Sequence, residues 1–210
     1  MRGSAVLADR RVLTTAAVVC GFALGFLDFV WIKFVPSPFA DLGNSSAVWA
    51  VAAFAFGWWV RTGVVRAAAA AAVLLVVAVP SYYLAALLIQ HDALAVLWAP
   101  SSLLWMFFGI LAGVVFGIAG VWARTSGWRL TVGAALPAAV LFAEAALQAG
   151  RIGDPNYGDE PVWLAVIRAV LGLLIILVAL RSTRQRALVL GAAVPLALVG
   201  LGAFTLAGFA

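Results

Sequence analysis

Residues 64–90 read VVRAAAAAAVLLVVAVPSYYLAALLIQ, a stretch that contains a single charged residue, Arg66. About 20 apolar residues are enough for an α-helix to cross the roughly 30 Å hydrocarbon core of a bilayer. The stretch therefore predicts a membrane-spanning helix. Pro80 stands before a pair of tyrosines and is expected to bend this helix, either to open a polar site or to accommodate its excess length by tilting.

The remainder of the chain has the same apolar character. Of 210 residues, 66% are hydrophobic and only 10% are charged, which is far too apolar for a soluble domain. We predict an all-α polytopic membrane protein with seven transmembrane helices, short loops and a single membrane domain over residues 1–210. The predicted spans are Val12–Phe34, Ser46–Arg61, Val64–Gln90, Ala99–Arg124, Trp128–Ala149, Val162–Arg181 and Ala187–Phe209.

Arginines gather at one set of predicted helix ends. Because short, positively charged loops stay in the cytoplasm, this bias predicts a cytoplasmic N-terminus and an external C-terminus. The net charge of +5 is then explained by contacts with lipid head groups, and nucleic-acid binding is not expected. The cytoplasmic group comprises Arg2, Arg10, Arg11, Arg61, Arg66, Arg124, Arg129, Arg181, Arg184 and Arg186, with Asp9 as its one carboxylate.

Three ionisable residues lie inside otherwise apolar spans, at nearly the same predicted depth. They are Asp28, Glu144 and Arg168. A charged side chain near the bilayer centre costs roughly 2.5 to 3.5 kcal/mol, so three in one small bundle predict a shared polar site. The predicted cytoplasmic halves are plain, as in the six alanines of 67–72. The site is therefore expected to open to the outside or to the outer leaflet, without forming a through-channel.

The candidate catalytic residues are Asp28 and Glu144. Gly21 and Gly25 share a helix face with Asp28, and their spacing allows another helix to approach closely. We therefore expect Asp28 to point into the bundle. An unpaired Glu144 in a low-dielectric environment would keep its proton and could donate or carry it, whereas pairing with Arg168 would make it a fixed anion between two helices.

Other side chains extend this predicted site. Glu144, Gln148 and Arg151 have the spacing i, i+4, i+7 and predict a polar stripe on one helix face. Aromatic side chains at similar depth can line a pocket and stabilise a cation. The predicted substrate-binding residues are Trp49, Tyr82, Tyr83, Trp105, Gln148 and Arg168.

Few residues suggest conventional catalysis. One histidine and one cysteine do not supply a metal-ligand set, and no phosphate-binding loop, Ser-His-Asp set or zinc motif is present. We predict no metal and no cofactor. Asn44, Ser45 and Ser46 precede the second span and are expected to cap it.

The stretch Asn44-Ser45-Ser46-Ala47-Val48-Trp49, followed by Ala53-Phe54 and Tyr82-Tyr83, resembles a family of small multi-spanning actinobacterial membrane proteins of unknown function. The resemblance covers about the first three spans and implies a bacterial plasma-membrane location. A looser likeness in size, helix count and buried carboxyl groups links the chain to seven-helix membrane terpene cyclases. Such a likeness implies an acid that protonates an isoprenoid chain.

Three functions remain open from these observations. The first, narrowly preferred, is a membrane enzyme that acts on a lipophilic, isoprenoid-like substrate with Asp28 or Glu144 as general acid. The second is a transport or substrate-capture component that binds a small charged solute or a proton from outside. The third is a structural accessory subunit. The expected partners are membrane lipids, one of these small molecules, and either a protein partner or a second copy of the chain.

Overall fold

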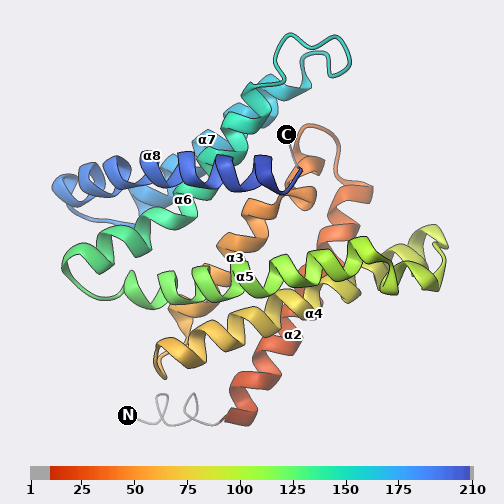
Figure 1. Cartoon of the computed structure of the whole chain (residues 1–210), viewed down its shortest axis with the longest axis horizontal. Helices are drawn as coiled ribbons and strands as arrows, with labels where there is room; N and C mark the ends of the chain where they lie inside the picture. Colours follow the sequence, from red (N-terminus) through yellow and green to blue (C-terminus); the bar gives the residue numbers. More distant parts are fainter. Residues whose placement is uncertain (1–9, 209–210) are drawn as a thin grey trace. The chain divides into compact units, whose positions relative to one another are not determined.

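The computed structural model describes residues 10–208, and within them all regular structure is helical (Figure 1). The elements are α2 (Arg10–Phe34), η1 (Phe39–Asn44), α3 (Ser46–Trp59), α4 (Val64–Gln90), η2 (Leu94–Trp98), α5 (Pro100–Trp122), α6 (Gly127–Ala149), α7 (Glu160–Ala179) and α8 (Thr183–Leu206). The two η elements are short 3-10 helices. The predicted all-α polytopic fold is confirmed. Arg2, Asp9 and the predicted end of the last span at Phe209 lie outside the described residues.

Six helices are long and apolar enough to cross a membrane, and α3 is a shorter apolar helix. The prediction for the second span extended to Arg61, but α3 ends at Trp59 and has 14 residues. At a rise of about 1.5 Å per residue, it measures roughly 21 Å. Helix α3 alone is therefore shorter than the hydrocarbon core, whereas the other predicted spans correspond to full-length helices.

The chain divides into two compact units. Unit 1 ends at Val121 and contains α2, α3, α4 and all of α5 except its last residue, while unit 2 begins at Trp122 and contains α6, α7 and α8. The single membrane domain that short loops predict stays a prediction. Asp28 belongs to unit 1, and both Glu144 and Arg168 belong to unit 2.

In unit 1, helices α2 and α4 pack in close contact. A Cβ atom added to Gly21 would collide with the backbone carbonyl of Leu74, and one added to Gly25 would collide with that of Ala78. The Ser81 hydroxyl, on α4, also donates a hydrogen bond of 2.6 Å to the carbonyl oxygen of Phe22. The close approach predicted from the glycine spacing is confirmed. Asp28, on the same face of α2, is buried inside unit 1.

Helix α5 packs through a stripe of glycines whose role was not predicted from the sequence. Gly109, Gly113 and Gly117 recur every four residues. A Cβ atom on Gly113 would collide with the backbone of Ala72, and one on Gly117 would lie 2.8 Å from the carbonyl oxygen of Ala67. The alanine run of α4, residues 67–72, therefore forms the surface against which α5 packs.

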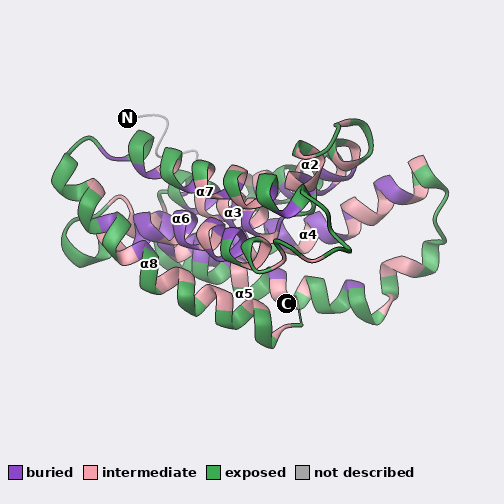
Figure 2. Ribbon diagram, turned by 90° about the horizontal axis from the view of Figure 1, so that it is seen from above, coloured by how far each residue is buried: buried purple, intermediate pink, exposed green. Residues whose placement is uncertain are grey.

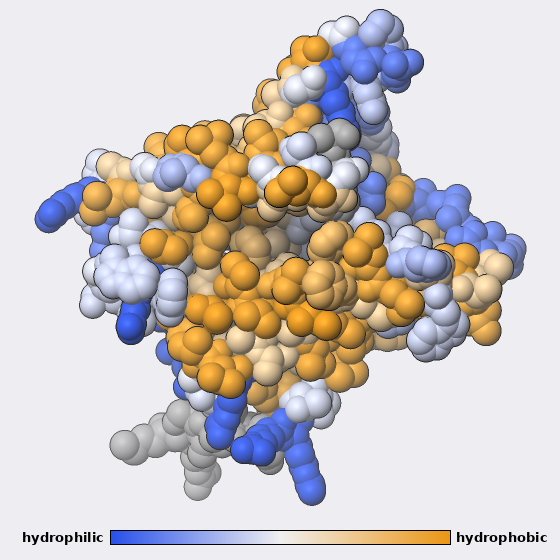
Figure 3. Space-filling view, viewed as in Figure 1, coloured by the Kyte–Doolittle hydropathy of each residue, from blue (hydrophilic) through white to orange (hydrophobic). Residues whose placement is uncertain are grey.

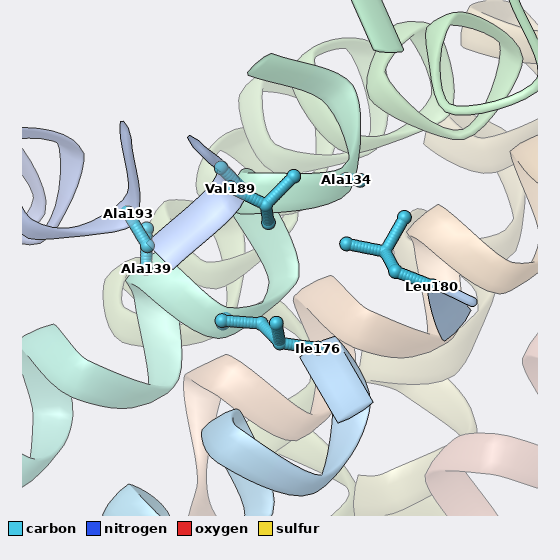
Figure 4. Close-up of a cluster of buried hydrophobic side chains, with 8 residues drawn as sticks. Ala134, Ala139, Ile176, Leu180, Val189 and Ala193 are labelled. Atoms are coloured by element: carbon cyan, nitrogen blue, oxygen red, sulfur yellow. The ribbon is translucent and has the colours of Figure 1, made fainter. Parts of the chain in front are cut away.

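In unit 2, helix α6 packs against both α7 and α8. Their contact is a cluster of small and branched side chains (Figure 4). Its buried members are Ala134, Ala135, Ala138, Ala139, Ile176, Leu180, Val189 and Ala193. Small side chains let membrane helices approach closely, so this cluster accounts for the tight packing of α6.

Away from these contacts, the helices expose apolar side chains. Helix α8 buries only Val189 and Ala193, and most of its ribbon is exposed or intermediate in Figure 2. Figure 3 shows hydrophobic residues along the visible helix surfaces and hydrophilic residues near helix ends and connections. Such surfaces fit a lipid environment, in which exposed apolar residues carry no hydrophobic penalty.

Candidate functional site

Asp28 of α2 is buried, with 8% of its surface exposed, and it faces α3. The indole Nε1 of Trp49 donates a hydrogen bond of 2.6 Å to its Oδ2 atom. No basic side chain among the described residues forms an ion pair with Asp28. A membrane-embedded carboxyl group is therefore held by a neutral donor, and when that group is ionised the described chain supplies no countercharge for it.

Asp28 lines a cavity of about 190 Å³ within unit 1. The wall of this cavity is formed by α2, α3, α4, α5 and the end of η1. Of the predicted site residues, Asp28, Trp49, Tyr82, Tyr83 and Trp105 all belong to it. The structure therefore brings together five side chains that the sequence placed at similar depth on four different helices.

The aromatic rings around Asp28 contact one another largely edge to face. The ring centroids of Trp49 and Tyr82 are 6.5 Å apart, and those of Tyr82 and Tyr83 are 5.5 Å apart at an interplanar angle of 87°. Trp105 makes a similar contact with Phe108 of the same helix. These contacts fix the rings in place. They form a largely aromatic wall opposite a single carboxyl group.

The start of α3 forms another part of the wall. Ser45 is the N-cap residue, and its side chain accepts a hydrogen bond of 3.2 Å from the amide of Val48. The capping predicted for Asn44, Ser45 and Ser46 is thus confirmed at Ser45. Because this cap already satisfies an amide at the start of the helix, the positive end of α3 has less to offer an anion.

Several lining residues were not predicted from the sequence. On α5, Phe108, Gly109 and Ala112 line the cavity beside Trp105. Their spacing of three, four and seven residues from Trp105 places them on one helix face. The same periodicity could have identified them once Trp105 had been chosen.

In unit 2, Glu144 and Arg168 form a buried ion pair between α6 and α7. The Nε atom of Arg168 donates to Oε2 of Glu144 over 2.9 Å, and its Nη1 donates to the carbonyl oxygen of Leu164 over 3.1 Å. The exposed fractions are 7% for Glu144 and 2% for Arg168. Of the two possibilities left open by the sequence, the geometry matches the fixed anion that joins two helices.

The predicted polar stripe on α6 is shorter than expected. Helix α6 ends at Ala149 with Gly150 as its C-cap residue, so Arg151 lies in the following turn. The Arg151 guanidinium lies 5.3 Å from the ring centroid of Tyr157. Only Glu144 and Gln148 therefore share the helix face. The convergence of Asp28 with the pair in unit 2 and the ligand-binding role of Gln148 stay predictions.

Comparison with known proteins identifies a family without identifying an activity. The sequence model of a family of unknown function, DUF6518, matches residues 5–208, and the chain belongs to that family. The match covers nearly the whole chain, whereas the resemblance to an actinobacterial family rested on about the first three spans and stays a prediction. No curated protein and no solved structure matches the chain.

Proposed function

We propose that this DUF6518 protein is a membrane-embedded capture or transport component whose ligand is a small organic cation. The observation that carries the proposal is a buried carboxyl group, Asp28, facing a cavity with no basic lining residue. Charged residues inside membrane spans commonly mark the paths of substrates or ions. A cation beside Asp28 would supply the countercharge that the described chain does not.

The cavity wall suits a cation better than an anion. Asp28 is the only charged residue among its lining residues, and aromatic rings form much of the remainder. The faces of Trp and Tyr rings attract cations, by about 2 kcal/mol or more once water is removed. An anion would instead meet the Asp28 carboxylate, and repulsion would disfavour it.

The size of the aromatic-lined cavity itself favours this function over the isoprenoid enzyme. Cavities of about 150 Å³ hold a benzene-sized molecule, whereas sites for larger ligands usually measure about 300–1,000 Å³. A volume of about 190 Å³ suits a substituted ammonium group but not a folded polyisoprenoid chain. The terpene-cyclase analogy therefore ranks second, with Asp28 as the acid that it would require.

We further propose that the protein works in a bacterial plasma membrane. The support is compositional: the chain is rich in alanine, valine, glycine and arginine, and Lys33 is its single lysine. The apolar helices support a membrane location in general. An actinobacterial origin belongs to the same proposal, and its support is the resemblance carried by the stretch Asn44-Ser45-Ser46-Ala47-Val48-Trp49 and the pair Tyr82-Tyr83.

The proposal can be tested by titrating the purified full chain with choline in phosphatidylglycerol nanodiscs. Because Trp49 and Trp105 line the cavity, tryptophan fluorescence should report saturable binding. We expect Asp28→Asn to weaken binding about 100-fold, equal to about 2.8 kcal/mol. Asp92→Asn removes an exposed charge from the same unit and should leave binding unchanged.

The neutral carbon isostere of choline, dimethylbutanol, separates charge from shape. It should fail to bind at concentrations that saturate the wild-type protein with choline. Equal titration of the wild type and Asp28→Asn by choline, or equal binding of the isostere, would rule out a cation site at Asp28.

A further inference from the structure

A second, larger cavity lies beside the first in unit 1. It measures about 920 Å³ and is a groove formed mainly by α2 and α3. On α2, its lining residues include Ala16, Cys20, Ala23 and Leu27, which follow one helix face at spacings of three or four residues. From Ala16 to Trp31, at about 1.5 Å per residue, this face extends over roughly 22 Å.

The opposite wall follows one face of α3. Val48, Ala52, Phe56 and Trp59 line it at spacings of three or four residues. Small alanine side chains on both helices keep the groove open. Leu27 and Cys20 are exposed, so the groove opens onto the surface that membrane lipid would contact.

The groove and the cavity share two lining residues. Asp28 and Gly43 line both of them. A Cβ atom on Gly43 would lie 2.9 Å from the backbone oxygen of Asp28 and 2.7 Å from the side chain of Ile32. A glycine at position 43 thus lets the chain pass close to α2 without adding a side chain at the junction.

We propose that the ligand is a membrane-soluble amphiphile whose ammonium head group occupies the cavity while its hydrocarbon chain lies in the groove between α2 and α3. This inference rests on the proposed cation site and adds a route to it from the surrounding lipid. Charge complementarity selects the occupant, because the apolar groove leads to the Asp28 carboxylate. An uncharged lipid would fill the groove equally well, but it would lack the ionic attraction to that carboxylate.

Affinity alone would be a poor test of this arrangement. A hydrocarbon chain is as well solvated by bilayer lipid as by an apolar groove, so a longer chain mainly raises partitioning into the membrane. The chain's position must therefore be measured directly. A suitable probe is hexadecyltrimethylammonium with a photoreactive diazirine in its chain, and the matched control is hexadecanol with the same diazirine.

The experiment uses the full chain in phosphatidylglycerol nanodiscs, whose lipids carry no ammonium group, with labelled residues mapped by mass spectrometry. The cationic probe should label the groove faces of α2 and α3, and labelling should fall at least tenfold in Asp28→Asn but not in Asp92→Asn. The neutral probe should label lipid-exposed faces throughout the protein, without dependence on Asp28. If both probes label the same residues, or if Asp28→Asn leaves the pattern unchanged, the inference is wrong.

A groove-filling variant separates this inference from the cation site itself. Ala52→Phe should reduce labelling of the groove at least tenfold and leave choline binding intact, which also shows that the variant folds. Should Ala52→Phe fail to bind choline, Ala55→Leu, at an exposed groove position, takes its place. Asp28-dependent choline binding without groove labelling by the cationic probe would overturn only the lipid route. Loss of both Asp28-dependent signals would overturn the cation site as well.

Discussion

Asp28 in unit 1 and Glu144 in unit 2 are equally buried carboxyl groups in membrane-length helices, yet their surroundings differ. Their exposed fractions are 8% and 7%, so burial does not distinguish them. Glu144 receives a guanidinium, while Asp28 receives an indole N–H and lines two cavities. The side chain that contacts a buried carboxyl group, more than the extent of its burial, therefore distinguishes a carboxyl group that joins two helices from one that is available to a ligand.

The largest expected effect concerns the ion pair of unit 2. Arg168→Met leaves Glu144 buried without its guanidinium, and breaking a buried pair in this way typically costs about 3–5 kcal/mol. Replacing both partners, as in Glu144→Leu with Arg168→Met, should recover most of that loss, because no buried charge remains. Equilibrium unfolding in mixed micelles of mild detergent and sodium dodecyl sulfate measures the difference. A double variant as unstable as Arg168→Met would show that the pair does more than join two helices.

The second effect concerns helix packing in unit 1. Gly25→Ala places a methyl group against the carbonyl of Ala78 and should destabilise the protein by about 1–3 kcal/mol, the usual cost of overpacking. The matched control is Gly191→Ala in α8, where an added Cβ meets no atom within 4 Å. That control should stabilise the helix by about 0.5–1 kcal/mol. If both variants unfold alike in the same micelle assay, the α2–α4 contact is looser than described.

Local features of this fold could be predicted from the sequence. Apolar runs gave helix ends close to those observed, because the length of a membrane helix is set by its own residues. Ser45 could be assigned as a cap and Gly25 as a contact point, since both depend on a short pattern. The early end of α3 at Trp59 was missed, because hydrophobicity continues through Val60 after the helix has ended.

The partners that buried side chains find across helices could not be decided from the sequence. Nothing in the sequence states that Trp49 donates to Asp28, or that Arg168 pairs with Glu144 rather than with Asp28. The alanine run at 67–72 shows no periodicity that would single out one face for α5. The glycine stripe of α5 could have been recognised in the sequence, however, because its four-residue spacing is typical of a close contact between helices, here the contact of α5 with α4.

A smaller effect is expected from the hydrogen bond at the cation site. Trp49→Phe keeps an aromatic ring in the cavity but removes the N–H that holds Asp28. A hydrogen bond to a charged group contributes about 1.5–3 kcal/mol, and part of this should be regained through solvent or ligand contacts. We therefore expect choline affinity to fall about tenfold, or about 1.4 kcal/mol. Trp58→Phe, on the same helix but outside both described cavities, should leave affinity unchanged.

The smallest expected effect is the change in the free energy of unfolding caused by Asp28→Asn, and it tests most directly whether Asp28 and Glu144 differ in role. Asp28→Asn keeps the volume of the side chain and an oxygen that can accept from Trp49, but it removes the charge. Because no basic side chain of the described chain pairs with Asp28, this removal breaks no ion pair. The free energy of unfolding should change by less than about 1 kcal/mol, or rise, since a charge in the membrane is itself costly. A loss as large as that of Arg168→Met in the same micelle assay would make Asp28 a structural residue like Glu144.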